Sequence, residues 1–341
     1  MTMTGGGLID AEVHCEVPDV AALMEYLPRH WRARLTENAW AGPAGAAHCY
    51  PAPVAGDRIA SVEQLRARII TPEFERILLT CYYGTEMIRH PDLARELASA
   101  VNRWLKTEWL DEEPRVAGTL VVPIDYPQAA ADEIRRWAVT DGFVQVLFPV
   151  VSQRTYGNRT YFPIYEAAQE RGFVIGLHFG GVSGVAPTPS GWPDLYIEES
   201  AGMAHVFQGQ ILSLVAEGVF QEFPSLRFSL LESGVTWLPS LLWRLDKMWK
   251  SYRREIPWVK SPPSTYLRER IRATLTPLDV PAEPRLALDF VEQMELEELL
   301  LFATDRPHVH GWDPTEMLAL LEPDRREPIL AGNARAWYGL G

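Results

Sequence analysis

Short apolar segments alternate with helical patterns along almost the whole chain. Each apolar segment has the length of a strand, and the sequence after it carries apolar residues at helical spacing. We expect eight strands, at residues 8–17, 76–81, 116–122, 143–148, 173–178, 226–231, 272–275 and 299–304. Strands that are buried on both faces and separated by helices predict a parallel sheet, and eight such units predict a closed (β/α)8 TIM barrel. An open doubly wound sheet is the alternative, but no G-x-G-x-x-G follows the first strand.

No change in composition marks a domain boundary, so we expect residues 1–341 to form a single TIM-barrel domain. A long insertion at residues 16–60 follows the first strand, and its part from 41 to 56 is rich in Gly, Pro and Ala. So long an irregular connection is usually functional, often as a lid, and an ordinary surface insertion is the alternative. A helical tail at residues 314–341 finishes the chain.

Composition narrows the range of partners. The net charge of -13, from 45 acidic against 32 basic residues, repels a phosphate backbone, so we expect no nucleic acid partner. The start of the chain lacks the features of a secretion signal, and no apolar run reaches the roughly 20 residues of a membrane span. Cys15, Cys49 and Cys81 form no C-x-x-C motif and suit a reducing compartment. We therefore expect a cytoplasmic protein that does not bind membranes.

The first predicted strand carries polar residues where a buried strand usually has aliphatic ones. It reads L-I-D-A-E-V-H-C-E-V from Leu8 to Val17. Because successive side chains of a strand point to opposite faces, Asp10, Glu12 and His14 share one face, about 6.6 Å apart in steps of two. A single E-x-H is weak evidence for a site. In a TIM barrel, however, functional residues gather at the C-terminal ends of several strands, so later strand ends decide its meaning.

Residues of the same chemical types follow three later strands. His178 ends the fifth strand within I-G-L-H-F-G-G, Glu232 follows the sixth, and Asp305 follows the eighth within T-D-R-P-H. Each alone has a simpler explanation, such as a carboxylate paired with an arginine, a buried core histidine or the cap of a turn. Two carboxylates and two imidazoles from different strand ends together predict a site for one divalent cation, zinc or manganese.

Several segments resemble a known family. They are I-D-A-E-V-H at the first strand, G-L-H-F-G-G at the fifth, F-A-T-D-R-P-H at the eighth and I-L-A-G-N-A-R-A-W-Y-G-L near the end. The chain is similar to the amidohydrolase-related branch of the amidohydrolase superfamily, which includes aminocarboxymuconate-semialdehyde decarboxylase and γ-resorcylate decarboxylase. The resemblance implies a TIM barrel of the metal-dependent hydrolase type, with one divalent metal bound by Glu12, His14, His178 and Asp305. The E-x-H of the first strand resembles the hydroxybenzoate decarboxylases of the family, whereas many other relatives have H-x-H.

The chain also departs from the family pattern. Several relatives have a histidine at the end of the sixth strand, where this chain has Glu232. This residue is either a general acid or base with a raised pKa or one half of a buried ion pair with Arg244 or Arg272. The tyrosine usual in the strand-eight motif is Arg306, which either holds a substrate carboxylate or faces solvent. We expect His308 to order the loop of Asp305.

The resemblance and the strand-end residues together predict a metal-dependent, non-oxidative decarboxylase of a small aromatic or unsaturated carboxylic acid. Asp305 or Glu232 would deliver the proton to the carbon that loses CO2. Four further residues are expected to contact the substrate through charge or an aromatic wall: Arg154, Arg306, Trp192 and Tyr82.

Two other functions use the same residues. A metal-bound water could attack an amide, ester or lactone, which would make the protein a hydrolase. The missing strand-six histidine also allows a binding barrel without catalysis. The partner in each case is a small molecule. The family commonly forms homodimers, and the tryptophan-rich region from Trp237 to Trp258 offers a surface for one, although these tryptophans suit a core equally well.

Overall fold

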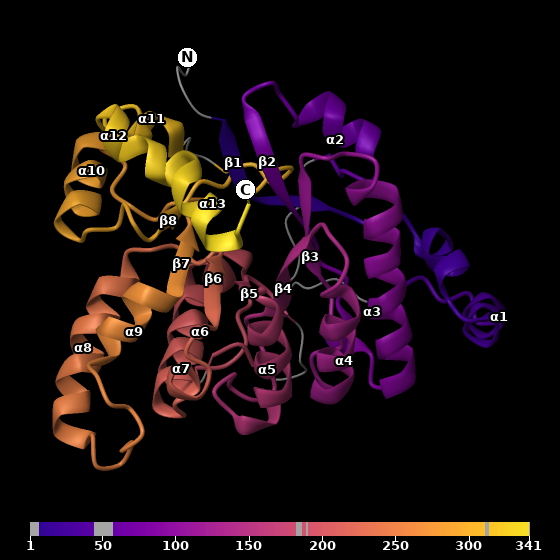
Figure 1. Ribbon diagram of the computed structural model, residues 1–341, viewed down its shortest axis with the longest axis horizontal. Coiled ribbons are helices and arrows are strands. Elements are labelled where there is room, and N and C mark those ends of the chain that lie inside the picture. The colour runs from indigo at the N-terminus through magenta and orange to yellow at the C-terminus, as the bar shows by residue number, and fades with distance from the viewer. Residues whose placement is uncertain (1–6, 44–56, 182–185, 189, 311–313, 341) are drawn as a thin grey trace.

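The computed structural model describes residues 7–43, 57–181, 186–188, 190–310 and 314–340. Within the predicted lid, residues 44–56, including Cys49, lie outside this part of the chain, so a lid function stays a prediction. The described part of the insertion holds a 3-10 helix, Val20–Tyr26, and the helix α1, Arg29–Glu37. Figure 1 shows α1 standing apart from the strands at one side of the molecule.

Eight parallel strands form one sheet in sequence order, as the sequence predicts (Figure 1). Their bounds lie close to the predicted ones, with the largest difference at the last strand. The strands are β1 (Leu8–Cys15), β2 (Phe74–Cys81), β3 (Val116–Leu120), β4 (Phe143–Pro149), β5 (Val174–His178), β6 (Arg227–Leu231), β7 (Ile271–Thr274) and β8 (Leu300–Leu301).

The barrel closes through the segment that follows β8. Ala11 N donates to Phe302 O at 2.8 Å, and His14 N donates to Arg306 O at 2.7 Å. These bonds join β1 to the segment after β8 in the way that neighbouring strands are joined elsewhere in the sheet. The prediction of a (β/α)8 TIM barrel is therefore confirmed.

The last strand is shorter than the predicted range of 299–304. Only Leu300–Leu301 pair as a regular strand, with β7. Phe302 N then donates to Ile329 O at 3.0 Å, and Asp305 has a φ of +56°. Because a left-handed residue cannot continue an extended strand, the chain turns here and brings the side chains after β8 over the end of the barrel.

Helices follow the strands and pack around them. Several begin with a proline in the first turn, where the missing N–H costs no hydrogen bond. Beyond α1 they are α2 (Val62–Arg68), α3 (Pro91–Leu105), α4 (Pro127–Trp137), α5 (Phe162–Arg171), α6 (Tyr196–Ala216), α7 (Val219–Glu222), α8 (Trp237–Tyr252), α9 (Pro263–Arg270), α10 (Pro284–Gln293), α11 (Pro314–Leu318), α12 (Pro323–Glu327) and α13 (Asn333–Tyr338). In the described ranges, no helix combines the length and apolar character needed to cross a membrane.

Three helical regions differ in detail from the prediction. The helical sequence between β5 and β6 is divided into α6 and α7, because Gly218 between them has a φ of +78°. The helix α9 was not predicted, since its sequence is mostly polar and carries little periodicity. The predicted tail consists of α11, α12 and α13, with a π-helical turn at Pro328–Gly332 before α13.

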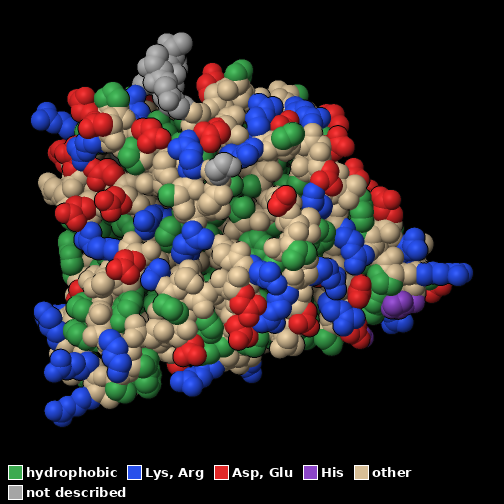
Figure 2. All heavy atoms as spheres, in the orientation of Figure 1, with side chains coloured by type: hydrophobic (Ala, Val, Ile, Leu, Met, Phe, Trp, Pro, Cys, Tyr) green, Lys and Arg blue, Asp and Glu red, His purple; other side chains and the backbone are tan. Residues whose placement is uncertain are grey.

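The C-terminal helix closes the end of the barrel opposite the strand C-termini. Trp337 and Tyr338 of α13 are buried in one cluster with Ile9, Ala117 and Val174, which lie near the starts of their strands. Because this helix covers the end of the barrel where the strands begin, we expect a functional site at the opposite end, where the strands finish. Over the face in Figure 2, acidic and basic side chains are interspersed.

Candidate active site

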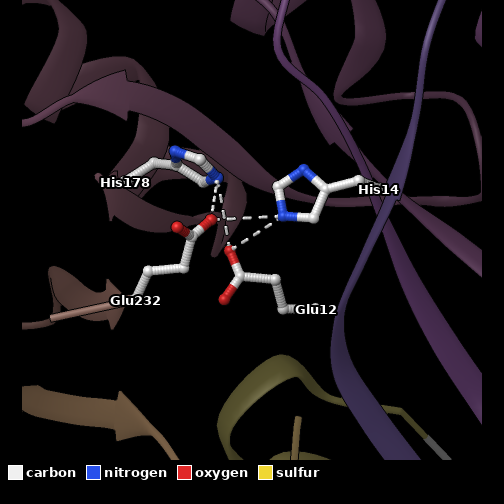
Figure 3. A group of neighbouring side chains, drawn as sticks. All are labelled: Glu12, His14, His178 and Glu232. Carbon is white, nitrogen blue, oxygen red and sulfur yellow. Dashed lines mark ion pairs between the residues drawn. The ribbon is translucent and has the colours of Figure 1, made fainter. Parts of the chain in front are cut away.

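Four polar side chains converge at the C-terminal ends of three strands. Glu12 and His14 point inward from β1, His178 is the last residue of β5, and Glu232 directly follows β6. Figure 3 shows that these side chains point toward one another. We call Glu12, His14, His178 and Glu232 the acid–histidine cluster. The strand alternation that put Glu12 and His14 on one face is thus observed, and Glu232 joins them from a position predicted only as an acid, a base or an ion-pair partner.

The distances within the acid–histidine cluster are short. Glu232 Oε1 lies 3.0 Å from His178 Nε2 and 3.3 Å from His14 Nε2. Glu12 Oε1 lies 3.4 Å from His178 Nε2 and 3.9 Å from His14 Nε2. One ligand atom from each of the four residues lies within 4.8 Å of all the others. Such an arrangement can surround a single ion.

The buried atoms at the centre of the acid–histidine cluster have no hydrogen-bond partner in the described part of the chain. They are both carboxylate oxygens of Glu12, Nε2 of His14, Nε2 of His178 and Oε1 of Glu232. Leaving a buried polar atom unsatisfied costs about 1–3 kcal/mol, so five in one place require an explanation. The Nδ1 of His178 lies 2.6 Å from Phe179 O, to which it must donate, so the neutral imidazole would offer its Nε2 lone pair to a metal ion. The donor set therefore fits a bound cation.

Asp305 lies beside this cluster and contacts three imidazoles. Its Oδ1 is 2.8 Å from His14 Nε2 and 2.9 Å from His308 Nδ1, and its Oδ2 is 2.7 Å from His310 Nε2. Asp305 belongs to a second group of possible ligands together with His14, Glu232 and His308. Its predicted role as a metal ligand stays a prediction, because this group does not include His178. The expected contact between His308 and Asp305 is present.

The electrostatics of the site favour a positive ion. Burial and the neighbouring Glu232 and Asp305 raise the pKa of Glu12 well above its usual value. Burial also opposes ionisation of Glu232, but His178 and His14 lower its pKa to about 2. At Asp305 burial is likewise outweighed, because the adjacent imidazoles of His14, His308 and His310 hold its pKa well below the usual range. The carboxyl groups of Glu12, Glu232 and Asp305 thus lie close together in a buried site, and a divalent cation would reduce the repulsion between them.

The backbone is left-handed at both acidic residues that follow the later strands. Glu232 has a φ of +58° and Asp305 a φ of +56°, and non-glycine residues in this region are uncommon. Glu232 N donates to Thr274 Oγ1 at 3.0 Å, and Asp305 N donates to Glu12 O at 3.0 Å. These bonds hold the two residues in a costly conformation that turns their side chains toward the barrel axis, a pattern typical of functional sites.

Asp10 lies on β1 two residues before Glu12, on the same face of the strand, and its hydrogen bonds support the site. Its carboxylate accepts hydrogen bonds from Thr304 Oγ1 at 2.6 Å, Thr304 N at 2.9 Å and Glu12 N at 3.2 Å. Although these bonds favour the ionised form, complete burial raises the pKa of Asp10 to about 6. Asp10 thereby ties the segment after β8 to β1 directly beneath Glu12.

The residues expected to contact a substrate differ in their placement. The ring of Tyr82 lies 5.5 Å from that of His178, and its hydroxyl donates to Glu86 Oε1 at 2.6 Å, so Tyr82 borders the cluster. Arg154, Trp192 and Arg306 are exposed, Trp192 by 52%. Their predicted contact with a substrate stays a prediction.

The predicted ion pair between Glu232 and an arginine is not seen among the described residues. Arg272 instead lies with its guanidinium 4.5 Å from the centre of the Trp337 ring. Glu232 is paired with the imidazoles of His14 and His178, as the distances above show. The alternative of a raised pKa for Glu232 is also wrong, because burial is outweighed by the imidazoles, which lower it to about 2. The contacts with His14 and His178 favour a place in the site over an ion pair with an arginine.

The sequence did not indicate His310 as a residue of the site. His310 holds Oδ2 of Asp305, but it lies five positions after this residue, in an irregular loop with no periodicity to indicate its direction. The alternation of histidines in H-V-H at 308–310 was the available signal. It parallels the E-x-H of β1, where the same spacing places two polar side chains on one face.

The chain is similar in sequence to known proteins. A family model described as Amidohydrolase matches residues 47–340. A gamma-resorcylate decarboxylase from Polaromonas sp. (strain JS666 / ATCC BAA-500) is 24% identical over 315 residues, which cover 81% of this chain and 90% of that protein. A protein of the same name from Rhodococcus jostii (strain RHA1) is 25% identical over 227 residues, which cover 63% of this chain and 66% of that protein.

The fold also matches solved structures over nearly its full length. The crystal structure of 5-carboxyvanillate decarboxylase from Novosphingobium aromaticivorans DSM 12444, complexed with manganese and 4-hydroxy-3-methoxy-5-nitrobenzoic acid, matches with a TM-score of 0.72 and 18% identity. The match covers 98% of this chain and 97% of that one. At this level of identity the likeness establishes the fold of the barrel.

Proposed function

The chain belongs to the amidohydrolase family, and from this premise we propose that it is a metal-dependent decarboxylase of a small aromatic carboxylic acid. The observation that carries the proposal is the acid–histidine cluster. Five of its buried ligand atoms have no hydrogen-bond partner among the described residues, and one ligand atom from each of its four residues lies within 4.8 Å of the others. The names of the relatives support the reaction type, because two relatives and a similar solved structure are named decarboxylases of hydroxylated aromatic acids.

We propose that Glu12, His14, His178 and Glu232 hold one divalent cation. Two carboxylates and two imidazoles suit manganese or zinc, and the manganese in the similar solved structure favours the former. When bound, the cation would hold the substrate carboxylate and a neighbouring oxygen and draw electron density from them. Asp305 could reach the same ion through Oδ1 from beside His14.

Loss of CO2 requires one proton. The bond between the ring carbon and the carboxyl carbon breaks, its electron pair stays on the ring carbon, and a proton must form the new C–H bond there. Asp305 is placed for this step, because its Oδ1 adjoins the acid–histidine cluster. Its low pKa keeps it ionised, so the proton would come from the imidazole of His308 or His310 and pass through the Asp305 carboxylate. The ring of Tyr82 would border the aromatic substrate beside His178.

The proposal is tested by adding hydroxybenzoates, including 2,6-dihydroxybenzoate, to protein freed of metal by chelation and reloaded with Mn²⁺. We expect equal amounts of CO2 and the decarboxylated phenol, and no turnover without metal. His178→Ala should lose both metal and activity. Turnover of amides or lactones without decarboxylated product would show a hydrolase instead. Metal binding without any turnover would show a binding barrel.

Two finer expectations accompany this proposal. A homodimer is consistent with the exposed aromatic residues of α8, among them Trp243 at 63% exposure. A cytoplasmic location is consistent with Cys15 and Cys81, which are buried and free. Sedimentation of the purified protein and fractionation of cells that express it would test these two expectations.

A further inference from the structure

The carboxylate of Asp305 is held from both of its oxygens. His14 and His308 approach Oδ1, and His310 approaches Oδ2 at 2.7 Å. The side chain of Asp305 is only 1% exposed, whereas that of His310 is 27% exposed. The imidazole of His310 therefore contacts the buried carboxylate at Oδ2 and is itself partly exposed to solvent.

The backbone near Asp305 is fixed independently of His310. Asp305 N donates to Glu12 O at 3.0 Å, and His308 N donates to Asp305 O at 3.0 Å. These bonds fix the Cα position but leave the carboxylate free to rotate about its last side-chain bond. Two contacts on the same oxygen restrain that rotation weakly, and a contact on the other oxygen sets the plane of the carboxylate.

We propose that His310 is a positioning residue, whose Nε2–H donates to Asp305 Oδ2 and turns Oδ1 toward the acid–histidine cluster. The inference rests on the proposed function, in which Asp305 delivers the proton to the ring carbon that loses CO2. It goes further by assigning a role to a loop residue outside the predicted ligands and acids. Groups that only orient a functional carboxylate or ligand typically change activity about 10–100-fold when removed.

The test compares two substitutions of His310 that differ in one hydrogen-bond donor. His310→Leu removes the donor, whereas His310→Gln keeps a side-chain N–H that reaches a similar distance. His205→Leu is the matched control, because His205 is exposed on α6. For each Mn²⁺-loaded protein, kcat and KM are measured by CO2 release from 2,6-dihydroxybenzoate, Mn²⁺ affinity by calorimetry, and folding by the melting temperature.

We expect His310→Leu to lower kcat about 10–100-fold with KM changed less than about threefold, and His310→Gln to recover most of the loss. Mn²⁺ affinity should fall less than kcat, since His310 contacts Asp305 and acts on the acid–histidine cluster only through it. A kcat within about twofold in His310→Leu, or an equal loss in His310→Gln, would overturn the inference. If the original protein neither binds Mn²⁺ nor releases CO2, the proposed function itself fails, which is a distinct outcome.

Discussion

Glu232 Oε1 lies 3.0 Å from His178 Nε2, yet neither atom has a hydrogen-bond partner within the part of the chain that the structure describes. When the imidazole of His178 is neutral, its Nε2 offers a lone pair, because its Nδ1 donates to Phe179 O. Two electron-rich atoms that face each other at this distance repel in the absence of a positive charge between or beside them. Their approach is thus best explained as part of a cation site that β5 and β6 share.

This relationship predicts that Glu232 contributes to metal affinity. Replacing it in Glu232→Gln removes one negative charge from the donor set. We expect the Mn²⁺ affinity of the metal-free protein to fall by at least about tenfold, since even indirect partners of metal ligands cost about 10–100-fold. Calorimetric titration measures the change. Glu217→Gln is the control, because Glu217 is exposed at the end of α6. Unchanged affinity in Glu232→Gln would contradict a ligand role.

A second prediction concerns the polar network that links the barrel to its C-terminal helix. The hydroxyl of Tyr338 donates to Gln145 Oε1 at 3.0 Å and lies 2.7 Å from Ser229 Oγ. All three side chains are buried, so Tyr338→Phe leaves the amide and hydroxyl without this partner. We expect the free energy of unfolding to fall by about 1–3 kcal/mol in urea titrations. Tyr252→Phe on α8, at 59% exposure, should change it by less than about 0.5 kcal/mol.

The free energy of unfolding should depend on pH through the ion pairs of Glu113. Its Oε1 accepts a hydrogen bond from Arg115 Nε at 2.9 Å and its Oε2 one from Arg66 Nε at 3.0 Å. Arg115 outweighs the effect of burial and, with Arg66, lowers the pKa of Glu113 to about 2 from 4.5. Because the folded pKa is the lower one, this stabilisation is complete above pH 4.5 and is lost as the pH falls toward 2.

Comparison with Glu113→Gln isolates this contribution. At pH 7 the variant should be less stable by about 1 kcal/mol, a modest value because both arginines are about 40% exposed and screened by solvent. The difference should shrink below pH 4.5 in urea titrations at successive pH values. The neighbouring Glu112→Gln, at an exposed position, serves as the control. A difference that stayed constant with pH would show that Glu113 acts through packing alone.

The sequence predicts the barrel well because the signals for it are local. Apolar runs separated by helical patterns placed all eight strands, and alternation placed Glu12 and His14 on the inner face of β1. The ends of strands then pointed to His178 and Asp305. Signals of this kind depend on neighbours in the chain, so a single sequence can carry them.

The remaining features depend on contacts between distant segments. The left-handed backbone that turns Glu232 inward is held by Thr274 of the next strand, which no local pattern reveals. Directly after the short β8, Phe302 N bonds to Ile329 O, a residue distant in the sequence. His310 contacts Asp305 from a loop without periodicity. In each case the position of a side chain is decided by tertiary contacts that override local preference.

The last prediction concerns Thr304, which joins the end of the barrel to the buried Asp10. Its hydroxyl donates to Asp10 Oδ2 at 2.6 Å, and its N–H donates to Oδ1 at 2.9 Å. Thr304→Val keeps the shape of the side chain and the backbone bond but removes the hydroxyl, so one buried carboxylate oxygen loses its partner. We expect a loss of about 1–3 kcal/mol in the free energy of unfolding.

The same substitution should also weaken the metal site. Asp10 accepts a hydrogen bond from Glu12 N, and Asp305 follows Thr304 directly, so a shift at this contact moves residues on both sides of the acid–histidine cluster. Mn²⁺ affinity in Thr304→Val should therefore fall together with stability, whereas Thr160→Val, at an exposed position before α5, should change neither. Loss of stability with unchanged Mn²⁺ affinity would show that Asp10 and Thr304 brace the barrel without positioning Glu12.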